Sequence, residues 1–169
     1  VDIEQLYKNK EGLLVLSGGN NSILKYSNGN NITSQSVSFV ADFKKEFIDN
    51  FYIEIQRIEG NDYRIDEEVI LNLAYDNNIP VVATNDVYFE GPDHFEAHDA
   101  LMCIEKKLFV SQKDRKRLSK NHYFKSQNEM QELFSDIPEA LFNTIEIAQR
   151  CSHRPKIKMP VLPSYHNDD

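Results

Sequence analysis

The sequence predicts an α/β fold with parallel strands. Three short segments, near residues 13–16, 51–56 and 79–83, are rich in β-branched, aromatic and other apolar residues, as is typical of buried strands. The segments between them repeat apolar residues at the spacing of amphipathic helices. Strands that alternate with helices usually pair in parallel through right-handed crossovers. We therefore expect the three strands to lie adjacent or nearly so in one sheet.

The composition is that of one soluble globular domain. The chain has 169 residues, 40% of them hydrophobic and 27% charged, with a net charge of −8. This negative charge disfavours nonspecific binding of nucleic acid by this segment alone. The two cysteines lie far apart in a chain without secretory features, so reduced thiols in a cytoplasmic protein are expected. No apolar run approaches the length of a membrane span. Because the chain opens at Val1 without an initiator methionine, it is interpreted as a piece of something larger.

Each element of the first half follows from local sequence. Glycines close the first strand, serines cap the next helix, and Gly60 and the Asn77-Asn78 pair interrupt the later segments. In chain order we expect a strand within residues 12–19, a loop over 20–31, a helix from Ser34 or Ser36 to about 49, a strand over 51–56, a helix over about 62–77 and a strand over 79–83.

The second half is predicted to be mostly helical. Ser126 and Glu129 have the spacing of a capping box, and Pro138 suits the first turn of a helix. We expect helices over about 92–107, from Ser126 onward and over 138–151, with a basic stretch over 114–120 and an extended segment over 123–126. The prolines of the tail favour a linker or a strap.

The most informative motif follows the third strand. Asn85 and Asp86 stand at its carboxyl end, where α/β folds gather functional groups. An Asp followed two residues later by a His would supply two metal ligands. Here the second position is Tyr88, whose protonated phenol is a poor ligand. Asp86 is read either as a residual metal ligand or as the cap of the following turn.

Several segments, in the same order, resemble the amino-terminal domain of the bacterial DNA polymerase III alpha subunit. They are GLLVLSG at 12–18, FYIEIQ at 51–56, PVVATNDV at 80–87, DHFEAHDA at 93–100, EMQELF at 129–134 and IPEALFNTIEIAQRC at 137–151. The resemblance implies the latter part of a polymerase and histidinol phosphatase (PHP) domain, a distorted TIM-like (β/α)7 barrel. It divides the chain into a partial barrel (1–110), a helical part (111–151) and a tail toward the polymerase core (152–169).

The resemblance also implies a function. The whole protein would be a DNA-directed DNA polymerase (a nucleotidyltransferase) of chromosomal replication, with Mg in a core beyond Asp169, and a His-x-His motif would precede Val1. This segment would be structural, would dock the proofreading exonuclease and other replicase subunits, and would contact DNA through the parent protein. No membrane contact is expected. By itself the segment would have no catalytic residues, cofactor or polymerase activity; the alternative is a metal-dependent PHP phosphoesterase.

The resemblance places metal ligands of active members at three positions that are changed here. They correspond to Gly19, Ile58 and Tyr88, none of which offers a good donor at neutral pH, so no metal or phosphoesterase activity is expected. Glu54 and Asp86 are the residual candidates for binding a cation.

Two further groups of residues have alternative interpretations. The cluster Lys113, Arg115, Lys116 and Arg117 could contact DNA or an acidic partner, or could form a solvated surface. His94 and His98 have a spacing that suits zinc on a helix when a third ligand joins. A packing or hydrogen-bonding role is favoured, because Glu96 is in the wrong register for a His-Glu-x-x-His motif and the resemblance includes Ala97-His98 as an ordinary helix feature.

Overall fold

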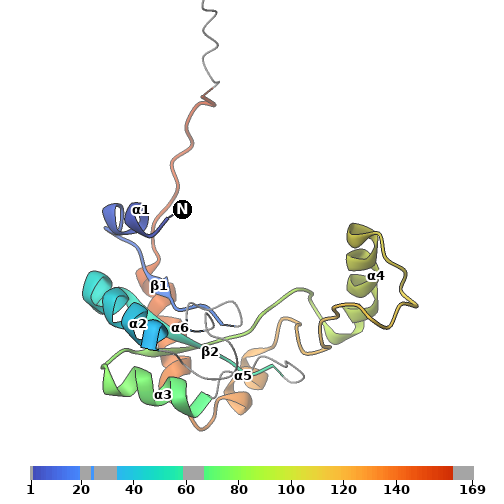
Figure 1. The fold of residues 1–169 in the computed structure, drawn as a ribbon, viewed down its shortest axis with the longest axis horizontal. Helices are drawn as coiled ribbons and strands as arrows, with labels where there is room; N and C mark the ends of the chain where they lie inside the picture. Colours follow the sequence, from blue (N-terminus) through green and yellow to red (C-terminus); the bar gives the residue numbers. More distant parts are fainter. Residues whose placement is uncertain (1, 20–23, 25–33, 59–66, 162–169) are drawn as a thin grey trace, which may run out of the picture.

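The chain forms a small parallel sheet with helices on both sides. The computed structural model describes residues 2–19, 24, 34–58 and 67–161. Strands β1 (Val15–Leu16), β2 (Phe51–Gln56) and β3 (Val81–Thr84) lie in the order β1-β2-β3, and both pairings are parallel (Figure 1). The predicted α/β class and the adjacency of the three strands are therefore confirmed. Closure into a TIM-like barrel remains a prediction, because the sheet has three strands within the described residues.

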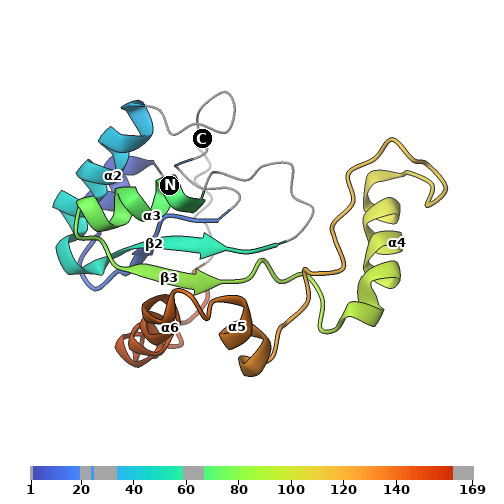
Figure 2. The ribbon, with the colours of Figure 1, turned by 90° about the horizontal axis from the view of Figure 1, so that it is seen from below.

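The described residues form helices on both sides of the sheet and one helix apart from it. The helices are α1 (Ile3–Lys8), α2 (Ser34–Phe47), α3 (Glu67–Asp76), α4 (Phe95–Lys106), α5 (Gln127–Leu133) and α6 (Pro138–Arg150), with short 3-10 turns at Ile48–Asn50 and Pro92–His94. Figure 2 shows α2 and α3 on one side of the sheet and α5 and α6 on the other. Both views place α4 apart from the sheet, within a long excursion that we call the arm (residues 90–125).

Most predicted elements are present with altered ends. Strand β1 is only two residues long, and β3 is shifted toward Thr84 relative to the expected 79–83. The beginning of the helix expected over 62–77 and most of the loop expected over 20–31 fall outside the described residues. Helix α1 is not among the predicted elements; the side chain of Asp2 caps it by accepting a 2.8 Å hydrogen bond from the backbone N–H of Gln5.

The core forms around the central strand. Phe51, Ile53 and Ile55 alternate along β2 and are 3% exposed or less, as expected of one face of a strand that packs under a helix layer. The ring of Phe51 contacts Phe43 of α2, with 5.6 Å between ring centroids, and Phe43 in turn stacks on Phe47. These contacts fix α2 against the sheet.

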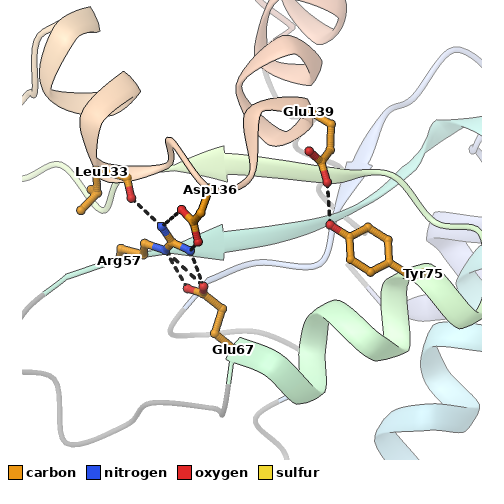
Figure 3. Close-up of polar contacts among 6 residues, drawn as sticks. All are labelled: Arg57, Glu67, Tyr75, Leu133, Asp136 and Glu139. Carbon is orange, nitrogen blue, oxygen red and sulfur yellow. Dashed lines mark hydrogen bonds and ion pairs between the residues drawn. The ribbon is translucent and has the colours of Figure 1, made fainter.

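An arginine at the end of β2 joins the two layers (Figure 3). Arg57 donates hydrogen bonds to Glu67 of α3, to Asp136 before α6 and to the backbone carbonyl of Leu133, each with a shortest distance of 2.5 Å. These hydrogen bonds raise the pKa of the guanidinium, with Asp136 the largest cause. Farther along the same side of β3, the Tyr75 hydroxyl donates to Glu139 at 2.6 Å.

Helix α6 covers the free edge of β3. The side-chain amide of Asn143 donates to the carbonyl of Val81 at 2.7 Å, so part of the edge is blocked against pairing with another strand. At the other end of α6, Arg150 donates to the Asp49 carbonyl at 3.0 Å and to the Tyr52 hydroxyl at 2.7 Å. Of the helices within the described ranges, none combines the length and apolarity that crossing a bilayer requires.

The predicted capping box at the start of α5 is confirmed. The Ser126 hydroxyl accepts from the Glu129 backbone, and the Glu129 carboxylate accepts from the Ser126 backbone at 2.8 Å. Hydrogen bonds from the hydroxyls of Ser126 and Tyr123 and from that backbone N–H lower the pKa of Glu129 to about 2. Folding therefore stabilises the ionised form of the Glu129 carboxyl group over its protonated form.

We predict that this cap makes folding acid-sensitive. Since the pKa of Glu129 is depressed from 4.5 to about 2, its contribution to stability is complete above about pH 4.5 and is lost as the pH falls toward 2. In Ser126→Ala, the pKa of Glu129 measured by NMR titration should rise, and unfolding should cost about 1 kcal/mol less at neutral pH. The exposed Ser135→Ala is the control. An unchanged Glu129 titration in Ser126→Ala would contradict this account of the cap.

Candidate functional site

The carboxyl ends of the three strands carry a polar cluster. Parallel register places Glu54 opposite Val82 and Gln56 opposite Thr84, and side chains two residues apart on a strand share a face. Glu54, Gln56 and Thr84 therefore point to the same side of the sheet. Ser17, just after β1, completes what we call the strand-end cluster.

Hydrogen bonds join all four members of this cluster. The Gln56 amide donates to the Glu54 carboxylate and to the Thr84 hydroxyl, both at 3.0 Å. The Thr84 hydroxyl donates to the same carboxylate oxygen, and the Ser17 hydroxyl accepts from the Glu54 backbone N–H at 3.0 Å. One oxygen of Glu54 is thus already bound by two donors, so a cation at that oxygen would have to compete with both.

The Gln56 amide lies where a side chain at position 19 would project. A Cβ placed on Gly19 would be 1.9 Å from Oε1 of Gln56 and 2.0 Å from its amide carbon. Position 19 is one of the ligand positions implied by the resemblance. In this chain a glycine and a glutamine together fill the corresponding space, so the cluster is held by hydrogen bonds among its own side chains.

The other two implied ligand positions lie in different surroundings. Ile58 is 5% exposed and belongs to the apolar core. Tyr88 is 48% exposed, and its ring makes edge contacts with His98 and His122 at centroid distances of 5.8 and 5.7 Å. Across residues 2–19, 24, 34–58 and 67–161, no three or more His, Cys, Asp or Glu side chains are grouped so as to hold a metal ion. His94 and His98 accordingly have no third ligand there.

The polar residues after β3 anchor the returning end of the arm. Asn85 donates to the carbonyl of Tyr123 at 2.6 Å, and Lys125 donates to the Asn121 carbonyl at 2.5 Å and to the Asn85 amide oxygen at 3.3 Å. Burial lowers the pKa of Lys125. Asp86, beside Asn85, is half-buried. Asn85 therefore acts in chain packing, whereas the role of Asp86 as ligand or cap stays a prediction.

The basic cluster is divided between the interior and the surface. Arg115 forms a two-pronged ion pair with Asp99 of α4, with both distances 2.5 Å and both side chains 2% exposed. Arg117 adds a 3.1 Å contact to Asp99, and the hydrogen bonds from Arg115 lower the pKa of Asp99. Lys113 and Lys116 are exposed. Arg117 is exposed too, with 43% of its side chain accessible, so three of the four predicted contact residues are accessible to DNA or a partner.

Two residues that matter here were not singled out from the sequence. Gln56 shares a strand face with Glu54, and this spacing of two was a usable signal. Lys125 gave no signal, because its position beside Asn85 depends on how the arm returns to the sheet.

Comparison with known proteins gives a consistent result. No protein-family model matches the chain. The chain is 40% identical over 162 residues to the DNA polymerase III subunit alpha of Caulobacter vibrioides, which covers 96% of the chain and 14% of that protein. The same subunit of Rickettsia bellii is 35% identical over the whole chain and 14% of its own length, and that of Pasteurella multocida is 35% identical over the whole chain and 15% of its length. The chain thus spans about one seventh of these relatives.

We predict that positions 19 and 56 are energetically coupled. Gly19→Ala should displace the Gln56 amide and lose its hydrogen bonds, at a cost of about 1–2 kcal/mol in unfolding free energy. In a Gln56→Ala background the same change should cost little, because the obstructing amide is gone. Urea unfolding of the two single variants and the double variant measures the coupling. Equal costs of Gly19→Ala in both backgrounds would show that the amide does not occupy this space.

Proposed function

The chain is homologous over nearly its full length to one segment of the bacterial DNA polymerase III alpha subunits, and on this premise we propose that it is a fragment of a replicative DNA polymerase. The identity of 40% across 96% of the chain is the observation that carries the proposal. The parent would be an enzyme that adds deoxynucleotides through metal-bound carboxylates. Those carboxylates, and their Mg, would lie in the part of the parent that this chain does not cover.

Within that polymerase, we propose that this segment is part of a PHP-type barrel with a structural role. The parallel β1-β2-β3 order and the helical crossovers support a portion of such a barrel. The joining of β2, α3 and the α5–α6 connection through Arg57 would give the segment a rigid frame. A cytoplasmic location follows from the role in replication.

The metal site of this barrel would be degenerate. Gln56 fills the space beside Gly19, Ile58 is 5% exposed, and Tyr88 packs against two histidines. These surroundings support stabilisation of the strand ends by hydrogen bonds in place of a metal. Glu54 and Asp86 would then attract a divalent cation only weakly, since two monodentate oxygens leave most of its shell to water.

A partner-binding role completes the proposal. The segment would dock the proofreading exonuclease and other replicase subunits, and would meet DNA through the parent protein. The exposed apolar side chains of α4, including Ile104 at 74% and Leu101 at 62%, support a surface that is covered in the assembled replicase.

We predict that a chimeric polymerase will be active. The matched segment of the Caulobacter vibrioides alpha subunit is replaced by this chain, and primer extension is measured on a primed template. Primer extension should be retained, because the catalytic core would be unchanged and this chain would take the structural place of the segment that it replaces. A chimera with the segment deleted is the control. A folded chimera that fails to extend primers, beside an active parent, would refute the proposed role.

We also predict that the chain alone is not a phosphoesterase. Hydrolysis of a phosphate ester with Mn or Zn should stay at the background rate, and dialysis against a weak chelator should leave no stoichiometric zinc. Asp86→Ala and the exposed Asp114→Ala should behave like the unmodified chain. Hydrolysis that is lost in Asp86→Ala but kept in Asp114→Ala would instead establish the PHP phosphoesterase alternative.

A further inference from the structure

The outer face of helix α6 carries an apolar stripe. Ala140 is buried and Asn143 donates to the Val81 carbonyl, so these two residues mark the face of α6 that packs on β3. Each residue turns a helix by about 100°, which places Phe142 and Ile145 on the side away from Ala140. Phe142 is 69% exposed and Ile145 is 55% exposed. A helix that is apolar on both sides is typical of one that is covered on both sides.

The stripe runs along the whole helix and contains no charged residue. Pro138 and Gln149 are exposed on the same side, which gives the stripe members at positions 138, 142, 145 and 149. Successive members are three or four residues apart and therefore about 4.5–6 Å apart along the helix axis. The flanking carboxylates of Glu139 and Glu146 accept hydrogen bonds from tyrosine hydroxyls of α3 and β2 at 2.6 and 3.1 Å. These hydrogen bonds draw both carboxylates toward the sheet.

The tail that follows α6 has a matching apolar side. Ile157, Met159 and Val161 are 103%, 87% and 93% exposed, and Figure 1 shows the tail leaving the folded part of the chain. In an extended chain alternate residues share a side. The three apolar side chains would then face one way, and those of Lys156 and Lys158 would face the other. Such a segment suits a position between an apolar surface and water.

We propose that residues 155–161 close onto the outer face of α6 as a strap. The tail starts at the end of this helix, and its first residues provide the turn that reverses the chain. Alternate residues of an extended chain recur about every 6.6 Å, close to the spacing of the stripe. In an antiparallel course Met159 then lies over Phe142. Ile157 lies nearer the end of the helix, over Ile145, and the lysines face water.

The size of the stripe favours a segment of the same chain over a separate partner. Each partner in a stable complex contributes about 20–30 residues, whereas the stripe offers a single helix face. A tethered segment needs less area, because a short linker raises its effective concentration to the order of mM. The inference concerns this chain alone and does not depend on the polymerase assignment.

Methyl NMR of the complete chain tests the strap. The chain has three methionines, so isotope labelling of their methyl groups gives one probe in the tail and two in the fold, Met102 and Met130. The Met159 methyl group should show NOEs to the ring of Phe142 and a signal that the ring current shifts from its random-coil position. In Phe142→Ser the Met159 signal should return to that position, while the other two signals stay in place. Phe109→Ser is the matched control, since Phe109 is 74% exposed in the arm; it should leave the Met159 signal unmoved.

Three outcomes would overturn the proposal. They are a random-coil Met159 signal without NOEs to Phe142 in the unmodified chain, a Met159 signal that Phe142→Ser leaves unmoved, and one that Phe109→Ser moves equally far. Dilution adds a fourth, because a Met159 signal that becomes random-coil as the chain is diluted would make the tail of a second copy the occupant. If Phe142→Ser unfolds the chain, the signals of Met102 and Met130 move as well, and the NOEs of the unmodified chain decide. The chimera assay is independent of all these outcomes, so failure here would leave the polymerase assignment intact.

Discussion

Strand β2 is the constraint on which the rest of the fold depends. It pairs with a strand on either side, its apolar residues fill the core beneath α2, and its polar residues reach the strand ends. Immediately after it, Arg57 joins α3 to the α5–α6 connection. A parallel sheet gains its stability from such burial on both faces. A shift in the register of β2 would therefore disrupt both the core and the strand-end cluster.

The strand ends illustrate how polar side chains can satisfy one another where parallel strands converge. Carboxyl ends of parallel strands converge whatever residues they bear, and partly buried polar groups there are stabilised by hydrogen-bond partners. In this chain the partners are the side chains themselves: Gln56 bridges Glu54 and Thr84, and Lys125 meets Asn85. The same logic governs the arm, where Arg115 and Asp99 satisfy each other in the interior and leave the lysines outside.

The sequence was sufficient for the order and type of most elements because their signals are local. The alternation of FYIEIQ, the Ser126–Glu129 box and Pro138 each specify an element without reference to the rest of the chain. The pairing of Arg115 with Asp99 and the placement of Gln56 beside Gly19 depend on contacts between distant segments, which periodicity does not encode. Short elements such as α1 and β1 carry too few residues for a clear pattern, so their presence or extent was missed.

In the function that we propose, side-chain hydrogen bonds occupy the place where a metal would bind. A crystal structure of the chain grown with Mn²⁺, with anomalous diffraction recorded for manganese, tests it most directly. We expect the Gln56 amide between Glu54 and Thr84, and no manganese peak at the strand ends. A manganese ion bound by Glu54 and Asp86, with the Gln56 amide turned away, would contradict it.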